Sequence, residues 1–376
     1  MTTLTITGGK RIDVDAGTTC DDDLHIADDV VVDALDGPAD RVVDVGGAFV
    51  APGFIDLHTH VFSHPLFATA RLEADRIGTR QGVACVVDAG SSGATTIDAF
   101  PRFVHETQQT RVFAFINIGS PGLPNLGGGH ASRPDLCDLP GVVRALERHD
   151  WLVGVKVLAS ASHTGSFGIE AVKLARKAAE LAGRPVMLHI GNAPPLIDDV
   201  LELLRPGDIV THTYHGKVGG VLGYRDRVIP AFRDAVERGV IVDVGHGRSS
   251  FSFRVCETAL AQGLPVHTIS SDLHRGNLDH HAVSLARTMS KLRALGMSLV
   301  DTVRAVTLAP AGAVGLEQLG FGAFTVGKPA YATVFEETTE PWQVEDAEGE
   351  QRTVPGRIET RGVAIGSTYH ERDAPL

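Results

Sequence analysis

The pattern of hydrophobic and polar positions changes character near residue 50. Before that point, short segments such as LTIT, RIDVD, VVVDAL and RVVDVGG alternate apolar with polar residues and are separated by turns. A period of two over runs of this length is typical of strands in a small antiparallel sheet. The first 49 residues are therefore predicted to form short β-strands.

From residue 50 onward, apolar runs of strand length alternate with segments of helical period. Runs that are apolar on both faces are typical of parallel strands covered by helices. Between residues 169 and 182 an apolar stripe recurs at helical spacing and stops at Gly183, where a glycine cap is expected. The eight apolar runs are FIDLH, VACVVDAG, RVFAFINIG, LVGVKVLA, PVMLHIG, DIVTHT, VIVDVGHG and PVHTISSD.

Eight strand and helix units match the size of a closed barrel, which is typically ~250 residues long. After about residue 321 the chain returns to strand-like segments, GAFTVGKPAYATVFE and RIETRGVAIGSTYH. The sequence therefore predicts an α/β fold with a TIM-like (β/α)8 barrel over residues 50–320. Beside it we expect a small composite β-sandwich domain built from residues 1–49 and 321–376.

Composition narrows the classes of partner. The 376 residues are 43% hydrophobic and carry a formal net charge of −12, which repels phosphate backbones and anionic membrane surfaces. No apolar run approaches the ~20 residues of a spanning helix, and the start MTTLTITGGK lacks the features of a signal peptide. The four cysteines show no CxxC spacing. We expect a cytoplasmic protein that binds neither nucleic acid nor membranes.

Potential metal ligands recur where the predicted barrel strands end. The first run ends in His58, with His60 two positions later, so both side chains leave the same face of the strand. Enzymes with this barrel place their chemistry at the carboxyl ends of the strands. Each residue alone could be a satisfied polar group in the core, but together they predict one site. The set is His58, His60, Lys156, His189, His212 and Asp272.

The chemistry of this set indicates divalent metal ions. Neutral imidazoles and a carboxylate are good ligands for zinc. A lysine ammonium cannot bind a metal, and inside a barrel Lys156 would need a partner. If carbon dioxide converts its amine to a carbamate, the lysine gains two anionic oxygens that can bridge two metals. We then expect two divalent ions, with zinc as the first candidate. One would lie on His58, His60 and Asp272, and the other on His189 and His212.

The order of these motifs resembles that of the amidohydrolase superfamily. Over residues 50–332 the segments PGFIDLHTH, GVKVLAS, MLHIG, IVTHTYHG, ISSDLH and VTLAPAGAVGLEQLGFGAFTVGKPA carry the likeness. Within the superfamily the chain is similar to the dihydroorotase-like branch of amidohydrolase/deacetylase metallohydrolases. The resemblance implies a distorted barrel with a composite β-sandwich, and a binuclear centre in which Lys156 is the carboxylated lysine and the other five residues are ligands.

The resemblance also implies a mechanism, in which a metal-bridging hydroxide hydrolyses the substrate. Asp272 would be both a metal ligand and the catalytic residue that takes a proton from the attacking water and passes it to the leaving group.

The substrate is less closely specified by the sequence. Dihydroorotases of the family follow HxH with an arginine, whereas Val61 and Phe62 follow His60 here, and the stretch VLASASH lacks the tyrosine of hydantoinases. The segment VDVGHGRSSFSF is nearer to members that cleave acyl groups from α-hydroxy or α-amino carboxylates. We therefore expect an ester or amide hydrolase acting on a small acylated acid. One alternative is a cyclic amide hydrolase. A second is a deaminase, although the bridging Lys156 counts against it, and a third is a non-catalytic scaffold.

The expected partners are a small molecule that bears a carboxylate and a possible second copy of the chain. A substrate with a carboxylate needs positively charged side chains to bind it. The arginines that follow the metal-site strands are candidates, although each could instead pair with a loop carboxylate. Aromatic and histidine side chains in the same loops could contact substrate or orient ligands. The candidates for substrate binding are Arg248 and Arg275, followed by Tyr214, His215, His246 and His274.

Overall fold

The computed structural model describes residues 2–65, 72–123 and 129–373. Its largest sheet has seven parallel strands that pair in chain order. Every residue of the fourth of these strands is buried, as expected for parallel strands covered on both faces. The seven strands are β8 (Ile55–Thr59), β9 (Cys85–Gly93), β10 (Arg111–Asn117), β11 (Leu152–Ala159), β12 (Val186–Ile190), β13 (Ile209–Thr211) and β14 (Ile241–Val242).

The eighth predicted strand closes the barrel as an irregular segment. It pairs with its two neighbours only through isolated parallel bridges, from Thr268 to Asp243 after β14 and from Leu273 to Thr59 of β8. The hydroxyl of Thr268 donates to the Asp243 carboxylate at 2.8 Å, in addition to the backbone hydrogen bonds of Thr268 with Val242 and Val244. Seven regular strands and this closing segment form a TIM-like barrel.

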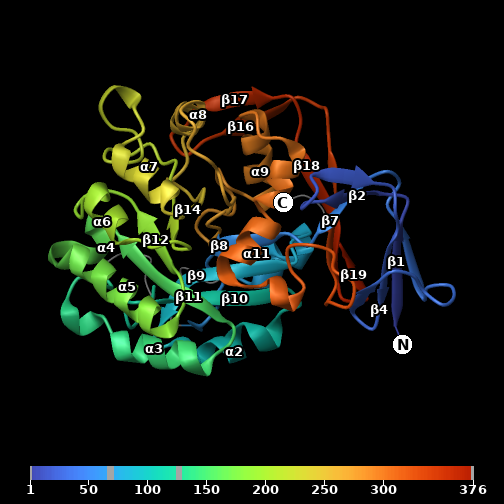
Figure 1. Ribbon diagram of the computed structural model, residues 1–376, viewed down its shortest axis with the longest axis horizontal. Helices are drawn as coiled ribbons and strands as arrows, with labels where there is room; N and C mark the ends of the chain where they lie inside the picture. The colour runs from blue at the N-terminus through green and yellow to red at the C-terminus, as the bar shows by residue number, and fades with distance from the viewer. Residues whose placement is uncertain (1, 66–71, 124–128, 374–376) are drawn as a thin grey trace.

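Helices cover the outside of the barrel, with α3, α5 and α6 together on one flank in Figure 1. The predicted helix is α5, which ends at Gly183 with φ 62°, a left-handed cap that glycine adopts freely. Among the helices described here, none is long and apolar enough to cross a membrane. The helices are α1 (Ala74–Ile77), α2 (Phe100–Phe103), α3 (Leu139–Arg148), α4 (Ala161–Thr164), α5 (Ile169–Ala182), α6 (Ile197–Leu203), α7 (Pro230–Glu237), α8 (Phe253–Ala261), α9 (Leu285–Ala294), α10 (Leu299–Arg304) and α11 (Leu308–Val314).

Strands from both ends of the chain share one sheet. In this six-stranded sheet β15 pairs antiparallel with β7 and with β18, and a second sheet has the order β5-β4-β1-β6. Both lie beside the barrel (Figure 1) and contribute to one apolar cluster. The separate sandwich domain stays a prediction. The strands are β1 (Thr3–Thr7), β2 (Lys10–Asp13), β3 (Thr18–Cys20), β4 (Leu24–Ala27), β5 (Val30–Val32), β6 (Arg41–Asp44), β7 (Phe49–Pro52), β15 (Tyr331–Glu337), β18 (Ile358–Ile365) and β19 (Thr368–Glu371).

A hairpin inside the last segment leaves the terminal sheets and packs on the barrel. It consists of β16 (Trp342–Glu345) and β17 (Gln351–Val354). The backbone of Ala347 donates to the carbonyl of Phe251 at 3.0 Å. The backbone of Phe253 in turn donates to Asp346 at 2.9 Å. Part of the range 321–376 therefore supports the loop after β14 instead of the terminal sheets.

Candidate metal centre

All six predicted ligands line one cavity of about 470 Å³ at the carboxyl ends of the barrel strands, hereafter the metal cavity. The strands place them there directly, because parallel strands end at the same rim. His58 lies on β8, Lys156 on β11 and His189 on β12. His60 and His212 directly follow β8 and β13, and Asp272 lies in the closing segment.

The polar atoms of these side chains converge. The Nε2 atom of His58 lies 3.2 Å from Nζ of Lys156 and 3.4 Å from Oδ1 of Asp272, and Nε2 of His60 lies 3.2 Å from the same oxygen. Ligand atoms of His58, His212 and Asp272 all lie within 4.8 Å of one another. Groups this close, with lone pairs on several of them, can hold a divalent ion.

Two of these residues have an unusual backbone. His212 and Asp272 adopt φ 66° and φ 51°, the left-handed region that residues other than glycine rarely enter. Such conformations cost about 1–3 kcal/mol each and are concentrated at functional sites. The strain is consistent with a backbone shaped to aim these two side chains into the metal cavity.

Burial keeps the imidazoles neutral. It lowers the pKa of His58 and His189 well below the usual value, and lowers the pKa of His212 to about 3. The positive charge of Lys156 adds to the shift at all three histidines. A neutral imidazole has the lone pair that a metal ion needs, so the site is ready to bind a cation at neutral pH.

Hydrogen bonds behind the ligands fix which ring nitrogen faces the metal cavity. Thr211 Oγ1 donates to Asp243 at 2.6 Å, so it accepts a hydrogen bond from Nδ1 of His58 at 2.9 Å. Nδ1 of His212 donates to the carbonyl of Gly245 at 2.6 Å. In both rings the proton lies on Nδ1 and Nε2 keeps its lone pair, as is common for histidines that bind metals.

Lys156 is fully buried and, among the described residues, forms no ion pair with a carboxylate. Burial lowers its pKa to about 7. The backbone of Gly90 passes close to Lys156, because a Cβ added at Gly90 would lie 2.5 Å from Cβ of Lys156. An amine with this pKa is uncharged in a substantial fraction of molecules at neutral pH, and the uncharged amine is the form that reacts with carbon dioxide.

Asp272 is held as an anion. Burial by itself raises the pKa of this carboxyl, but the hydrogen bond from His60 and the nearby imidazoles together lower it to about 2. A carboxylate in this state can act as a ligand and, once its environment changes during a reaction, as a proton acceptor.

Two of the predicted substrate residues, Arg248 and His274, line the metal cavity. Arg275 is exposed and does not line it. Tyr214 is fully buried, and its hydroxyl donates to the carbonyl of Pro265 at 2.6 Å, so its ring belongs to the core beneath the helices. Tyr214 and Arg275 therefore lie outside the lining of the metal cavity.

The other two histidine candidates also point elsewhere. His246 is buried and accepts a hydrogen bond at Nε2 from Lys291 Nζ at 2.8 Å. Lys291 also donates to the carbonyl of Glu345, so this pair ties the loop after β14 to the β16–β17 hairpin. His215 accepts a hydrogen bond at Nδ1 from the backbone of Lys217 and faces away from the metal cavity. Both are buried and contact other parts of the chain instead of lining the metal cavity.

The structure adds residues that the sequence argument did not select. Lys217 lines the metal cavity, and burial lowers its pKa. His163 lines it too, with its ring centroid 5.5 Å from that of His189. Both follow barrel strands that carry ligands, and this position was the signal that could have identified them. Ser160, Ser162, Asn192, Ser249 and Ser250 complete the polar lining.

A TIM-like barrel with these side chains at its strand ends defines a class, the barrel hydrolases that depend on metal ions. The chain belongs to the amidohydrolase family, which residues 49–354 match. Members of this family generally use a divalent metal ion, and the cluster of His58, His212 and Asp272 is suited to one.

Proteins that are similar to this chain over most of its length differ in the activities that their names give. The chain is 36% identical to a deacetylase from Agrobacterium fabrum, over 89% of this chain and 82% of that protein. It is similar to a crystal structure of a dihydroorotase, with 32% identity, 100% and 99% coverage and a TM-score of 0.91. A crystal structure of an adenine deaminase matches with 30% identity, 98% and 99% coverage and a TM-score of 0.91. The chain is therefore a hydrolase of the amidohydrolase family.

Proposed function

We propose that this amidohydrolase cleaves the ester or amide bond of a small acylated α-hydroxy or α-amino acid at a two-metal centre. The observation that carries the proposal is a single cavity that combines the six ligand residues with two cationic side chains, Arg248 and Lys217. The ligands suit hydrolysis, and the cations suit a substrate carboxylate.

The donors are suited to divalent ions, and the proposal divides the six ligand residues between two of them. Nε2 atoms of neutral imidazoles and a carboxylate oxygen meet in a buried space, and their other ring nitrogens are engaged by protein groups. When bound, two such ions supply Lewis acidity at the scissile carbonyl and a water of lowered pKa. Zinc is the proposed metal, because nitrogen and oxygen donors in this number suit it.

Lys156 is the proposed bridge between the two ions, as a carbamate. Its Nζ lies beside His58 at 3.2 Å in the middle of the ligand set. No carboxylate in the described part of the chain neutralises it by an ion pair. A cation at the centre of a cation site is unfavourable, and the carbamate replaces that positive charge with a negative one.

Residues of this chain carry the other steps. The carboxylate of Asp272 takes the proton of the attacking water at Oδ and delivers it to the leaving alcohol or amine. Arg248 and Lys217 hold the carboxylate of the acid by charge-assisted hydrogen bonds, which places the acyl bond over the ligands. His274, which also lines the metal cavity, is available to the same substrate.

The similarity to deacetylases supports removal of an acyl group. The alternative, hydrolysis of a cyclic amide, is supported by a different comparison. The similarity to a dihydroorotase structure at 32% identity favours a ring-opening hydrolase. Against it, Val61 and Phe62 occupy the positions where a dihydroorotase would carry its arginine, and both are buried. The bridging Lys156 counts against a deaminase, and the complete ligand set counts against a non-catalytic scaffold.

A substrate panel tests the proposal. The chain, produced with zinc and bicarbonate, is assayed on acylated D- and L-amino acids and α-hydroxy acids, with dihydroorotate, hydantoin and adenine as controls. We expect turnover of one acylated series and two metal ions per chain by elemental analysis. Turnover confined to the cyclic controls would reject the acyl substrate, and one ion or none would reject the two-metal centre.

A further inference from the structure

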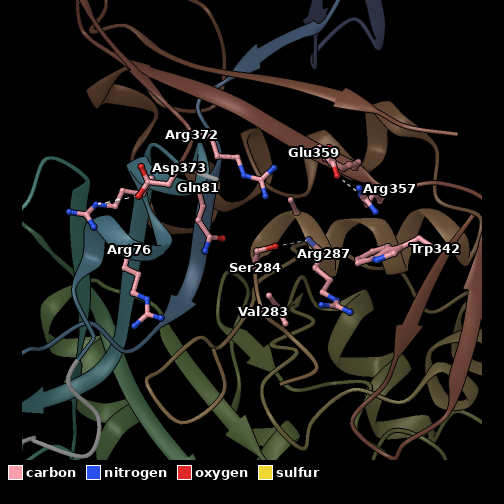
Figure 2. Close-up of a pocket in the computed structure, with 13 residues that line it drawn as sticks. Arg76, Gln81, Val283, Ser284, Arg287, Trp342, Arg357, Glu359, Arg372 and Asp373 are labelled. Carbon is pink, nitrogen blue, oxygen red and sulfur yellow. Dashed lines mark hydrogen bonds and ion pairs between the residues drawn. The ribbon is translucent and has the colours of Figure 1, made fainter. Parts of the chain in front are cut away.

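A second cavity, of about 360 Å³, lies between the barrel and the terminal strands and shares no residue with the metal cavity. Its lining is rich in arginine, and we name it the arginine cavity. Figure 2 shows Arg76, Gln81 and Asp373 on one side, Arg287, Trp342 and Arg357 on the other, and Arg372 between them. Its five arginines are Arg76, Arg80, Arg287, Arg357 and Arg372.

These arginines outnumber their acidic partners. Arg80 pairs with Asp373 at 3.9 Å, and Arg357 pairs with Glu359. Only these two carboxylates line the arginine cavity as described, against five guanidinium groups. The whole chain carries a net charge of −12, so this concentration of positive charge runs against the general composition.

Arg287 is the most constrained of the five. Its guanidinium lies over the ring of Trp342, 4.7 Å from the ring centroid, and Arg357 lies over the same ring at 5.6 Å. Its Nε is buried and has no hydrogen-bond partner among the described residues. A buried donor without an acceptor is costly, and an anion that draws the guanidinium toward the arginine cavity would relieve this cost.

The backbone adds to the positive potential. Arg287 lies in the first turn of α9, whose cap residue Ser284 accepts a hydrogen bond from the Arg287 backbone at 3.1 Å. The start of a helix carries a partial positive charge. Val283, which leads into this cap and lines the arginine cavity, adopts φ 56°, a strained conformation for a β-branched residue.

From this arrangement we infer that the arginine cavity binds a small phosphate-bearing anion. Planar guanidinium groups present paired donors that match the oxygens of phosphate, and several of them around one space favour a ligand with more than one negative charge. The ligand would connect α1 and α9 of the barrel with the strands β18 and β19. The inference does not rest on the proposed hydrolase activity.

Isothermal titration calorimetry at constant ionic strength tests this inference on the full chain. The probes are inorganic phosphate and a hexose bisphosphate, which separate free phosphate from a phosphorylated metabolite. We expect one binding event per chain that weakens about tenfold or more in Arg287→Gln and in Arg372→Gln, because each change removes a charge-assisted hydrogen bond. Tighter binding of the bisphosphate identifies a metabolite, and equal affinity identifies phosphate itself.

The control variant is Arg133→Gln, which removes an exposed arginine paired with Asp135, away from the arginine cavity. It should bind both probes as the unmodified chain does. Thermal unfolding without anion establishes that each variant is folded, and with anion it should show a rise in Tm that Arg287→Gln loses. Failure of both probes to bind, or equal binding by the unmodified chain and both arginine variants, would overturn the inference.

Discussion

The metal cavity and the arginine cavity both gather ionisable side chains from distant parts of the chain, yet they are built differently. In the metal cavity burial lowers the pKa of His58, His189 and His212, and His58 and His212 are each held by a partner at the second ring nitrogen. In the arginine cavity guanidinium groups outnumber carboxylates, and Nε of Arg287 lacks a partner among the described residues. The metal cavity therefore offers lone pairs to a cation, whereas the arginine cavity offers hydrogen-bond donors to an anion.

The largest expected effect comes from Lys156→Ala. Loss of the bridge should reduce the metal content from two ions to one or none and lower kcat by more than about a hundredfold, beyond the range typical for partners that stand behind ligands. Elemental analysis and steady-state kinetics measure both. Arg287→Gln, which removes a charged side chain outside the metal cavity, is the control and should change neither quantity. Full activity of Lys156→Ala would exclude the carbamate.

Asp272→Asn should lower kcat by about 10²–10⁴-fold, because an amide cannot accept the proton of water. Part of the metal should remain, since the imidazoles are untouched, and metal content and kcat are measured on the same sample. A kcat equal to that of the unmodified chain would contradict the role of Asp272 as proton carrier.

The two cations of the metal cavity should act on substrate binding. Lys217→Met and Arg248→Met are each expected to raise KM about 10–100-fold, with a smaller change in kcat, because a charge-assisted contact to the carboxylate is lost. An acyl ester without a carboxylate is the control, and its KM should not respond. If both substrates respond equally, these residues do not bind the carboxylate.

Thr211→Val removes the hydroxyl between His58 and Asp243, and should lower metal affinity about tenfold. Thr213→Val is the matched control, since the hydroxyl of this neighbouring buried residue bonds to the carbonyl of Val210 instead. Competition with a chelator measures both variants. Equal affinities would show that His58 is oriented without this contact.

The smallest effect concerns pH. Burial lowers the pKa of His215 to about 4, so the unfolded chain binds a proton there below pH 6.5 while the folded chain does not. Stability should therefore fall as pH drops from 6.5 to about 4, by up to ~1.4 kcal/mol per pH unit for this group. Urea unfolding with a chelator present should show a shallower pH dependence for His215→Gln. An unchanged slope would mean that His215 is protonated in the fold.

The sequence predicted the barrel and the convergence of the six candidate ligands in one cavity, because both depend on local patterns. Strand length, burial on two faces and the location of a residue at a strand end place His58, Lys156 and Asp272 without knowledge of loops. The eighth run was predicted as a strand, but it joins each neighbour only through an isolated bridge contact. Periodicity carries no information about such a contact.

Residues beyond the strand ends could not be predicted in the same way. Tyr214 and His246 follow barrel strands closely, but the loops turn Tyr214 into the core and His246 toward Lys291. Lys217 turns the other way, into the metal cavity. Loop direction depends on tertiary contacts such as those of the β16–β17 hairpin. The arginine cavity is still harder to predict from the sequence, because its side chains come from five separate segments and share no motif.

The closing segment of the barrel has a consequence for how the chain becomes active. The backbone of Asp272 donates to the carbonyl of His58 at 2.7 Å, and that of His60 donates to the carbonyl of Leu273 at 2.8 Å. The hydrogen bonds that close the barrel are thus made by the backbone of candidate ligand residues and their neighbour Leu273. Contacts between ends so distant along the chain form late in folding. Recovery of turnover during refolding would therefore report the final step of assembly, and a partly folded chain would be inert toward substrate.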